Sequence, residues 1–321
     1  MILMRVARGL LTYVPAIEKR IGVSTGGTDS ARYCYSVWLR HLAMAHASQL
    51  PDAPRVIAEL GPGDSLGIGV MSLLTGASQY VGLDVVQYAD TSRNLSLLDD
   101  LVELLRTRAP IPDATEFPEV KPYLSSYAFP SRVLSEERLA RCLAASRVAA
   151  IRRALEHIGE PVRTEGGEEI RIMYRVPWFD PAVIQRGSID MVYSQAVLEH
   201  VDDLATTYTA LTAWLKPGGV ASHQIGFVSH GITPEWNGHW TISDPVWKLI
   251  RGRRPYLLNR EPASTHVRML RESGLEIVKE ERVHKPSDVA RSRLAPRFRS
   301  MSEEDLTTKA IFLQAIKRNT K

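Results

Sequence analysis

The sequence predicts an α/β fold with a doubly wound, mainly parallel sheet of seven strands and a helical insertion after the second strand. Two observations carry this prediction. Short apolar runs alternate along the chain with stretches in which apolar residues recur at helical spacing, and this alternation favours a parallel sheet. The run that starts at Val56 also ends in a glycine-rich turn, and the next run ends on Asp84, so two strands and the helix between them are clearly marked.

The first half of the chain supplies two strands and most of the predicted helices. Thr28 or Asp29 is expected to cap a helix that leads into the strand at residues 56–59. After the glycine turn a helix ends at Gly76, and residues 80–83 form the second strand. Residues 92–160 show three helical patterns broken by prolines. We expect residues 92–168 to form an insertion that covers a binding pocket at the mouth of the sheet; covering a sheet edge is the alternative.

The second half of the chain completes the predicted sheet. Strands are expected at residues 169–174, 188–194 and 220–227, and a helix from Asp202 carries an apolar face and stops at Pro217. A helix from Ser264 ends at Gly274, and the last two strands are expected at residues 275–283 and 308–316. The chain therefore divides into an N-terminal helical segment (1–50), a main domain (51–91 and 169–321) and the insertion (92–168).

Composition narrows the class of protein. The proportions of hydrophobic and charged residues, 44% and 24%, are those of a globular protein, and no apolar run is long enough to span a bilayer. The first 22 residues lack the apolar core of a signal peptide, and the two cysteines, Cys34 and Cys142, are too few for a disulfide framework, so we expect a cytoplasmic protein. The net charge of +4 comes from scattered arginines, which we read as surface residues rather than a nucleic-acid site; contact with a phosphate or an anionic substrate is the alternative.

The turn between the first two strands is the most informative motif. Gly61 and Gly63 let the backbone turn sharply and let a ligand approach where a Cβ atom would collide. Asp84, at the tip of the second strand, is placed to accept hydrogen bonds from both hydroxyls of a ribose. Glu59 precedes the turn and Asp64 lies in it, and their negative charges suit a cationic ligand better than a diphosphate. The motif therefore indicates an adenosine-containing cofactor that carries positive charge.

Three segments resemble motifs of the class I S-adenosylmethionine-dependent methyltransferases. Residues 59–64 resemble their motif I, in which an acidic residue precedes Gly-x-Gly, although Ser65 stands where that family has a third glycine. Residues 189–201, with Leu-Glu-His-Val, resemble the fourth-strand motif of the small-molecule enzymes, and residues 215–219 resemble the turn before the fifth strand. The matches run from about residue 55 to 90 and from 170 to 228. They imply a Rossmann-like fold and S-adenosyl-L-methionine as the cofactor.

The resemblance also implies roles for individual residues. The turn would border the methionyl end of the cofactor with help from Glu59, Asp84 would hold the ribose, and Val85 would lie beside the adenine. Trp178 and its neighbours would form the other side of the adenine slot, with core packing of Trp178 as the alternative. The expected cofactor-binding residues are Glu59, Gly61, Pro62, Gly63, Asp64, Asp84, Val85, Val176, Pro177, Trp178, Ser194, Gln195 and His200.

The region after the fifth strand supplies the candidates for catalysis. A hydroxyl acceptor is a weak nucleophile at neutral pH, so a general base would help, and His230 or His239 is preferred, with His223 in reserve. Trp236 and Trp240 offer aromatic faces that suit a sugar ring. Histidines this close could instead join Glu235 or Asp244 around a divalent metal, but no ligand spacing supports a site, and we expect no metal.

The sequence therefore predicts a methyltransferase that acts on an oxygen of a small or saccharide-type acceptor, such as a glycan precursor; an amine, a carbon acid or a lipid-linked quinone-type ring is the alternative acceptor. An NAD(P)-dependent oxidoreductase is the first alternative, although the acidic turn and the lack of a Tyr-x-x-x-Lys pair disfavour it. A non-catalytic binding protein with a methyltransferase-like fold is the second, and the intact glycine turn and Asp84 disfavour it. We expect neither a nucleic-acid partner nor stable membrane insertion, and a homodimer stays open.

Overall fold

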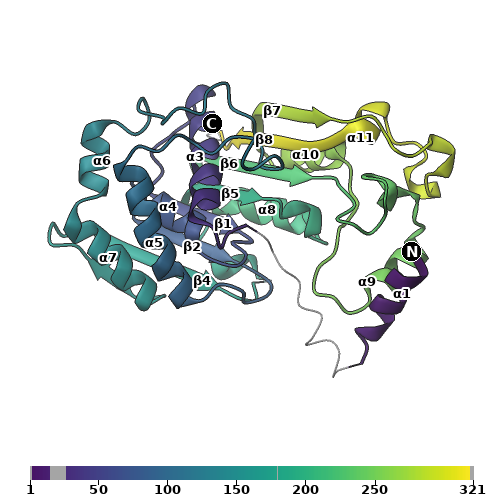
Figure 1. Ribbon diagram of the computed structural model, residues 1–321, viewed down its shortest axis with the longest axis horizontal. Coiled ribbons are helices and arrows are strands. Elements are labelled where there is room, and N and C mark those ends of the chain that lie inside the picture. Colours follow the sequence, from purple (N-terminus) through teal and green to yellow (C-terminus); the bar gives the residue numbers. More distant parts are fainter. Residues whose placement is uncertain (1, 15–26, 179, 319–321) are drawn as a thin grey trace.

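The computed structural model describes residues 2–14, 27–178 and 180–318, and its centre is one eight-stranded sheet (Figure 1). The strand order is β3-β4-β2-β1-β5-β6-β8-β7. Among the residues that the structure describes, no helix is long and apolar enough to cross a membrane. The strands are β1 (Val56–Leu60), β2 (Gln79–Leu83), β3 (Pro161–Arg163), β4 (Glu169–Arg175), β5 (Ile189–Gln195), β6 (Leu215–Gly226), β7 (Glu276–His284) and β8 (Thr308–Ile316).

The sheet is mixed, with a parallel centre. Strands β4, β2, β1, β5 and β6 pair in parallel, while β8 is antiparallel to both β6 and β7, and β3 is antiparallel to β4. All seven predicted strands are present, but the prediction of seven is corrected to eight. The short edge strand β3 was missed because Val162 stands alone between Pro161 and Arg163, and three residues are too few to show an alternating pattern.

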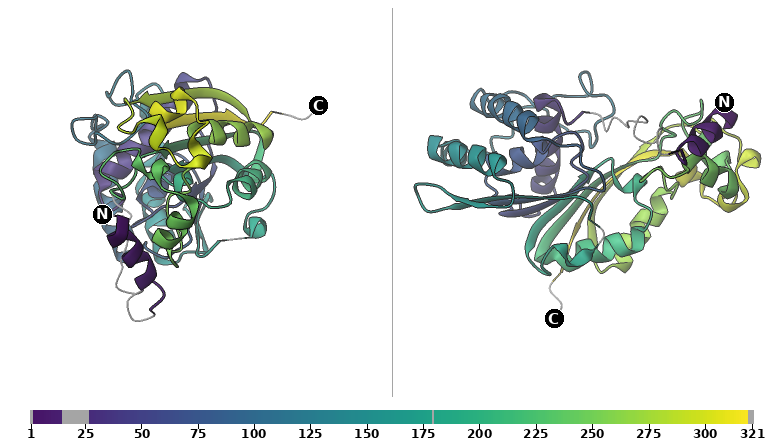
Figure 2. Two further views of the ribbon diagram at one scale, coloured as in Figure 1. Left: turned by 90° about the vertical axis from the view of Figure 1, so that its right-hand side faces the viewer. Right: turned by 90° about the horizontal axis from the view of Figure 1, so that it is seen from below.

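Helices cover both faces of the sheet (Figure 2). Helices α3, α4, α5 and α7 lie on one face, and α8 and α10 lie on the other. The described helices are α1 (Ile2–Leu11), α3 (Ala31–Ala47), α4 (Gly67–Leu74), α5 (Thr91–Arg106), α6 (Glu136–Cys142), α7 (Ala145–Glu156), α8 (Leu204–Trp214), α9 (Asp244–Arg251), α10 (Ala263–Glu272) and α11 (Glu303–Thr307). Part of the expected N-terminal helical segment, residues 15–26, lies outside the described residues.

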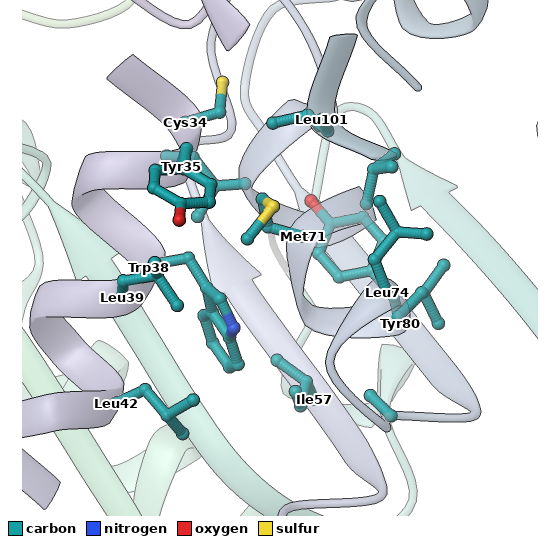
Figure 3. Close-up of a cluster of buried hydrophobic side chains, with 14 of the residues drawn as sticks. Cys34, Tyr35, Trp38, Leu39, Leu42, Ile57, Met71, Leu74, Tyr80 and Leu101 are labelled. Carbon is teal, nitrogen blue, oxygen red and sulfur yellow. The ribbon is translucent and has the colours of Figure 1, made fainter. Parts of the chain in front are cut away.

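The alternation of side chains along the strands divides the core into two layers. In β1, Ile57 packs under the helices of the first face, and Ala58 and Leu60 pack toward the second face. Figure 3 shows part of the first layer, where Trp38 and Leu42 of α3 lie near Ile57 of β1 and Met71 of α4. Helix α4 approaches β2 closely at Gly69, where a Cβ atom would lie 2.2 Å from the ring of Tyr80. This packing fixes the position of the helix that follows the turn after β1.

The cap of α3 differs from the prediction. Ser30, and neither Thr28 nor Asp29, caps the helix, because its Oγ accepts a hydrogen bond from the backbone N–H of Tyr33 at 3.3 Å. The Oγ1 of Thr28 instead accepts a hydrogen bond from the backbone N–H of Ser65 at 3.2 Å. Thr28 therefore ties the segment before α3 to the glycine-rich turn.

Helix α1 packs against the C-terminal end of α9, far from it in sequence (Figure 1). The two backbones touch at glycines: a Cβ atom on Gly9 would lie 1.9 Å from the carbonyl oxygen of Leu249, and one on Gly252 would lie 2.1 Å from that of Gly9. The Oγ1 of Thr12 also accepts a hydrogen bond from the backbone N–H of Arg253 at 2.8 Å. Helix α1 is thus held by contacts that only glycine permits.

Candidate functional site

A cavity of about 1150 Å³ opens at the carboxyl ends of β1, β2 and β5. This is the edge at which open α/β sheets bind ligands. It is larger than an ordinary pocket for one small ligand. Its described lining residues come from eight parts of the chain: Arg5, Arg8, Leu11, Thr28, Tyr33, Leu60, Gly61, Pro62, Gly63, Ile68, Leu83, Asp84, Val85, Tyr88, Trp178, Gln195, Ala196, Val197, His200, Val201, Asp202, Asp203, Thr206, Thr207, His230, Ile232, Ile250, Arg254, Pro255, Tyr256, Leu257 and Leu258.

The glycine-rich turn forms one wall of this cavity. Gly61 and Gly63 both have positive φ, +63° and +75°, which side chains other than glycine rarely adopt. A Cβ atom on Gly61 would lie 2.6 Å from Cγ2 of Val197, in the loop after β5. The N–H of Gly61 also donates to the carbonyl of Leu83 at 2.8 Å. The sharp backbone turn predicted from these glycines is therefore confirmed, and the group that excludes a Cβ atom at Gly61 is the side chain of Val197.

Asp84 lies beside the turn and lines the cavity. Its Oδ1 accepts a hydrogen bond from the N–H of Val85 at 2.7 Å, and its Oδ2 lies 3.4 Å from the N–H of Gly63. Only 8% of the residue is exposed, and burial raises the pKa of the carboxyl group. Each oxygen can still accept a further hydrogen bond from a ligand, as a ribose diol would require.

The other two acidic residues of the motif are not in the cavity wall. Glu59 is buried and its Oε2 accepts a hydrogen bond from the hydroxyl of Tyr80 at 2.5 Å. Burial raises the pKa of Glu59 to about 8, so at pH 7 this carboxyl group is mostly protonated. The backbone carbonyl of Asp64 accepts a hydrogen bond from Nη1 of Arg93 at 3.0 Å, and Asp64 is not among the lining residues. Of the three acidic residues of the motif, Asp84 is therefore the one that lines the cavity, and the expectation that a charged Glu59 borders the ligand is corrected.

The segment after β4 is only partly placed as expected. The N–H of Trp178 donates to the carbonyl of Asp84 at 3.1 Å, and its indole lines the cavity while packing edge-on against Trp214, with ring centroids 5.4 Å apart. Val85 also lines the cavity. Val176 and Pro177 do not. Trp178 thus combines the two alternatives, a cavity wall and core packing.

At the end of β5, two neighbouring side chains lie in different surroundings. Gln195 lines the cavity, and its Oε1 lies 3.1 Å from Nε2 of His41. Ser194 is fully buried, with its Oγ 2.8 Å from Nδ1 of His223, and neither of these residues lines the cavity. Burial lowers the pKa of His223 to about 3. His223 is thus a buried neutral imidazole of the core and is not placed to act as the reserve base.

The two preferred histidines are separated as well. His239 is buried outside the cavity, with its ring 4.6 Å from that of Trp240, and burial lowers its pKa to about 3. His230 lines the cavity and faces His200, with ring centroids 5.1 Å apart. Burial lowers the pKa of His230 below its usual 6.5 and that of His200 to about 3. Only His230, of the three candidates, is within reach of a ligand in this cavity.

The expectation that Trp236 and Trp240 offer faces to a substrate is wrong. Both indoles are buried, and their N–H groups donate to the carbonyls of Pro286 and Arg260, at 2.9 and 3.0 Å. A tryptophan fully occupied in a core leaves no face for a ligand. The aromatic lining comes instead from Tyr33, Tyr88, Trp178 and Tyr256, and the hydroxyls of Tyr88 and Tyr256 lie 2.8 Å apart.

One set of described residues could hold a metal ion. Glu199, His200 and His230 each offer a ligand atom within 4.8 Å of the others. Oε2 of Glu199 and Nδ1 of His200 have no hydrogen-bond partner among the described atoms. Glu235 and Asp244, which the sequence suggested as metal ligands, instead form ion pairs with arginines.

The roof of the cavity was not predicted. No residue between 92 and 168 lines it, because α5 and α7 pack on the sheet face, where Leu101 and Ile151 are fully buried. Among the described residues, the roof is formed by α1 and residues 250–258. Arg5 and Arg8 are three residues apart, which places them on one side of α1. That spacing is visible in the sequence, but nothing local shows that this side faces a cavity.

The chain is similar to known methyltransferases. No curated protein matches its sequence. The model of the methyltransferase domain family matches residues 150–222, which include β4, β5 and α8. Similar solved structures include a methyltransferase from Mesorhizobium loti, which depends on S-adenosylmethionine (16% identity, TM-score 0.40, covering 90% of this chain and 100% of that one). Another is phosphoethanolamine N-methyltransferase 2 of Haemonchus contortus in complex with S-adenosyl-L-methionine (12%, 0.43, 90% and 58%). A third is an S-adenosylmethionine-dependent methyltransferase of Methanosarcina mazei (12%, 0.43, 86% and 98%).

The matched stretch contributes Trp178, Gln195 and His200 to the cavity that the glycine turn and Asp84 complete. Over residues 150–222 the chain is therefore similar to the methyltransferase domain family, and part of this matched stretch forms the wall of the cavity.

Proposed function

We propose that the protein transfers the methyl group of S-adenosylmethionine to an oxygen of a small acceptor, of the saccharide or glycan-precursor type. The cavity, at about 1150 Å³, exceeds the 300–1000 Å³ usual for one small ligand, so it has room for a cofactor and an acceptor side by side. Its far half presents tyrosine rings and imidazoles, which suit an acceptor that is polar at its edges.

The near half of the cavity is the proposed cofactor site. Gly61, Pro62 and Gly63 leave room for the ligand against the backbone, Asp84 accepts hydrogen bonds from the ribose, and Val85 and Trp178 flank the adenine. When bound, the cofactor supplies a methyl group on a sulfonium, which a nucleophile displaces in line while the electron pair of the broken C–S bond stays on sulfur. The protein must hold the two reactants aligned and exclude water.

His230 is the proposed general base. Its lowered pKa keeps the imidazole neutral at pH 7, so a ring nitrogen can take the proton of the acceptor hydroxyl as the new C–O bond forms. His200, neutral at the same pH, lies beside it and orients the ring. His230 is the candidate carried forward because His223 and His239 are both buried away from the cavity.

The observation that carries the proposal is the Asp84 carboxylate facing the cavity beside two glycines of positive φ. Calorimetric titration with S-adenosylhomocysteine tests it, with NADH as the competing ligand. We expect the first to bind and the second not to. Asp84→Asn should weaken the binding of S-adenosylhomocysteine at least tenfold, or by about 1.4 kcal/mol of binding free energy, because two charge-assisted hydrogen bonds are lost.

The matched control is Asp100→Asn, which removes one carboxylate from the exposed side of α5. It should leave the affinity unchanged. Tight NADH binding, or equal affinities for the wild type and Asp84→Asn, would overturn the cofactor assignment. Turnover of acceptor hydroxyls with a labelled methyl donor then separates an enzyme from a non-catalytic binding protein.

A further inference from the structure

Three arginines meet at the far end of the cavity. Arg5 and Arg8 come from α1, and Arg254 comes from the segment after α9. Arg5 donates to the carbonyl of Gly231, and Nη1 of Arg254 donates to the carbonyl of Ile250 at 3.0 Å, so both guanidinium groups are held in place. Burial, together with the charges of Arg5 and Arg8, lowers the pKa of Arg254. The three positive charges are therefore close enough to repel one another.

No carboxylate balances this cluster within the described ranges. The two acidic residues that line the same end of the cavity are already engaged: Asp202 pairs with Arg251, and Asp203 accepts a hydrogen bond from the N–H of Thr206 at 3.0 Å to cap α8. An uncompensated group of like charges costs free energy in the free protein, and a bound anion would recover it. Guanidinium groups bind the oxygens of phosphates and carboxylates in pairs.

The arginines next to Arg254 in the sequence do not line the cavity. Arg251, Arg253 and Arg254 lie within four residues, yet only Arg254 lines the cavity. Arg251 is held by Asp202, and the guanidinium of Arg253 lies over the ring of Tyr13, 5.1 Å from its centroid. The glycine contact between α1 and α9 fixes Arg5 and Arg8 opposite Arg254.

We propose that Arg5, Arg8 and Arg254 form an anion subsite that holds a phosphate or carboxylate group of the methyl acceptor. This inference rests on the proposed function, and it names the class of acceptor: a small molecule that carries an anionic group beside the oxygen to be methylated. The subsite binds and orients the acceptor and takes no part in the proton transfer, which is assigned to His230.

The test is titration of the protein, saturated with S-adenosylhomocysteine, with inorganic phosphate and separately with acetate. Saturation matters because S-adenosylhomocysteine has a carboxylate of its own. We expect one anion site that weakens with added salt. Arg254→Gln and the double variant Arg5→Gln/Arg8→Gln should each weaken it about tenfold, because each loses charge-assisted hydrogen bonds. The tighter of the two probes identifies phosphate or carboxylate as the group recognised.

Arg253→Gln is the matched control, because it removes the same charge one residue away but outside the cavity. It should change anion affinity less than twofold, and S-adenosylhomocysteine affinity should be unchanged in all variants. If neither phosphate nor acetate binds while S-adenosylhomocysteine does, the subsite is refuted and the proposed function stands. If S-adenosylhomocysteine itself weakens in Arg254→Gln, the arginines hold the cofactor instead, and the subsite is again refuted. Failure of S-adenosylhomocysteine to bind the wild type would refute the proposed function.

Discussion

At the scale of single residues, His230 has the environment that a general base needs. It faces the cavity, and burial lowers its pKa below 6.5, so the neutral form dominates at pH 7. Activity should therefore be flat above neutral pH and fall as the pH drops through the pKa of His230, where the imidazole takes up a proton.

We expect His230→Gln to lower kcat about 100-fold, in the range that general bases contribute, and to remove this acid limb. A pH profile of kcat/KM for both proteins is the measurement. His157→Gln, at an exposed position on the end of α7, serves as control. An unchanged acid limb in His230→Gln would rule out His230 as the base.

Gly61 is the second residue whose role can be isolated. An alanine there would be strained by its φ of +63° and would also collide with Val197. We expect Gly61→Ala to weaken S-adenosylhomocysteine at least tenfold, measured by calorimetry, since about 1 to 2 kcal/mol of strain displaces the turn.

The second substitution Val197→Ala should restore part of that affinity, because it removes the collision and leaves the backbone strain. Gly159→Ala is the matched control: its φ is +102°, but nothing lies within 4 Å of the added Cβ atom. If Val197→Ala restores nothing, contact between the two loops does not position the turn.

At the scale of elements, the mobility of α1 should depend on its glycine contact with α9. Gly9→Ala places a Cβ atom 1.9 Å from the carbonyl oxygen of Leu249, and crowding of this kind costs about 1 to 3 kcal/mol. Hydrogen exchange in residues 2–14 should rise at least fivefold. Ala7→Val adds volume on the exposed side of the same helix and should leave exchange unchanged. Equal exchange in both variants would show that α1 is not held through Gly9.

The elements also show how far sequence reasoning reaches. The strands were predicted because their apolar runs are local signals, and the β8 boundaries at residues 308–316 were matched. The turn at Gly61 and the position of Asp84 followed from local conformational needs. The prediction that residues 92–168 cover the binding pocket was wrong, because the sequence of an amphipathic helix such as α5 does not show which surface the helix packs against. The packing of α1 over the cavity was not predicted, because the contacting residues Gly9 and Gly252 are far apart in the chain. Trp236 was wrongly predicted to face a substrate, because the sequence does not distinguish a buried indole from an exposed one.

At the scale of the whole molecule, buried titratable groups set the dependence of stability on pH. Burial lowers the pKa of five histidines to about 3 or 4, so the unfolded chain binds more protons below pH 6.5, and stability is lost as the pH falls. Burial raises the pKa of Glu59 and Glu199 to about 8, from 4.5, so stability is lost as the pH rises through that window. The five histidines outweigh the two carboxyls below pH 6.5, and the carboxyls dominate above it.

The free energy of unfolding should therefore be greatest near pH 6.5. Urea denaturation at a series of pH values measures it, and each group contributes a slope of about 1.4 kcal/mol per pH unit inside its window. Glu199→Gln should reduce the slope of unfolding free energy against pH above pH 6.5 by the contribution of one group. Glu165→Gln, at an exposed position, should leave this slope unchanged. A stability that keeps rising to pH 8 would contradict this account.

The glycine contact between α1 and α9 has a consequence for the order of assembly. The contact joins Gly9 to Gly252, which are far apart in the sequence. Because closing so long a loop is slow, we expect this contact to form after the local contacts and the sheet contacts. The part of the cavity proposed to bind the cofactor is formed by the ends of the sheet strands. The part that contains Arg5, Arg8 and Arg254 forms only after α1 has packed against α9. During refolding the chain should therefore acquire affinity for S-adenosylhomocysteine before it acquires affinity for an anion.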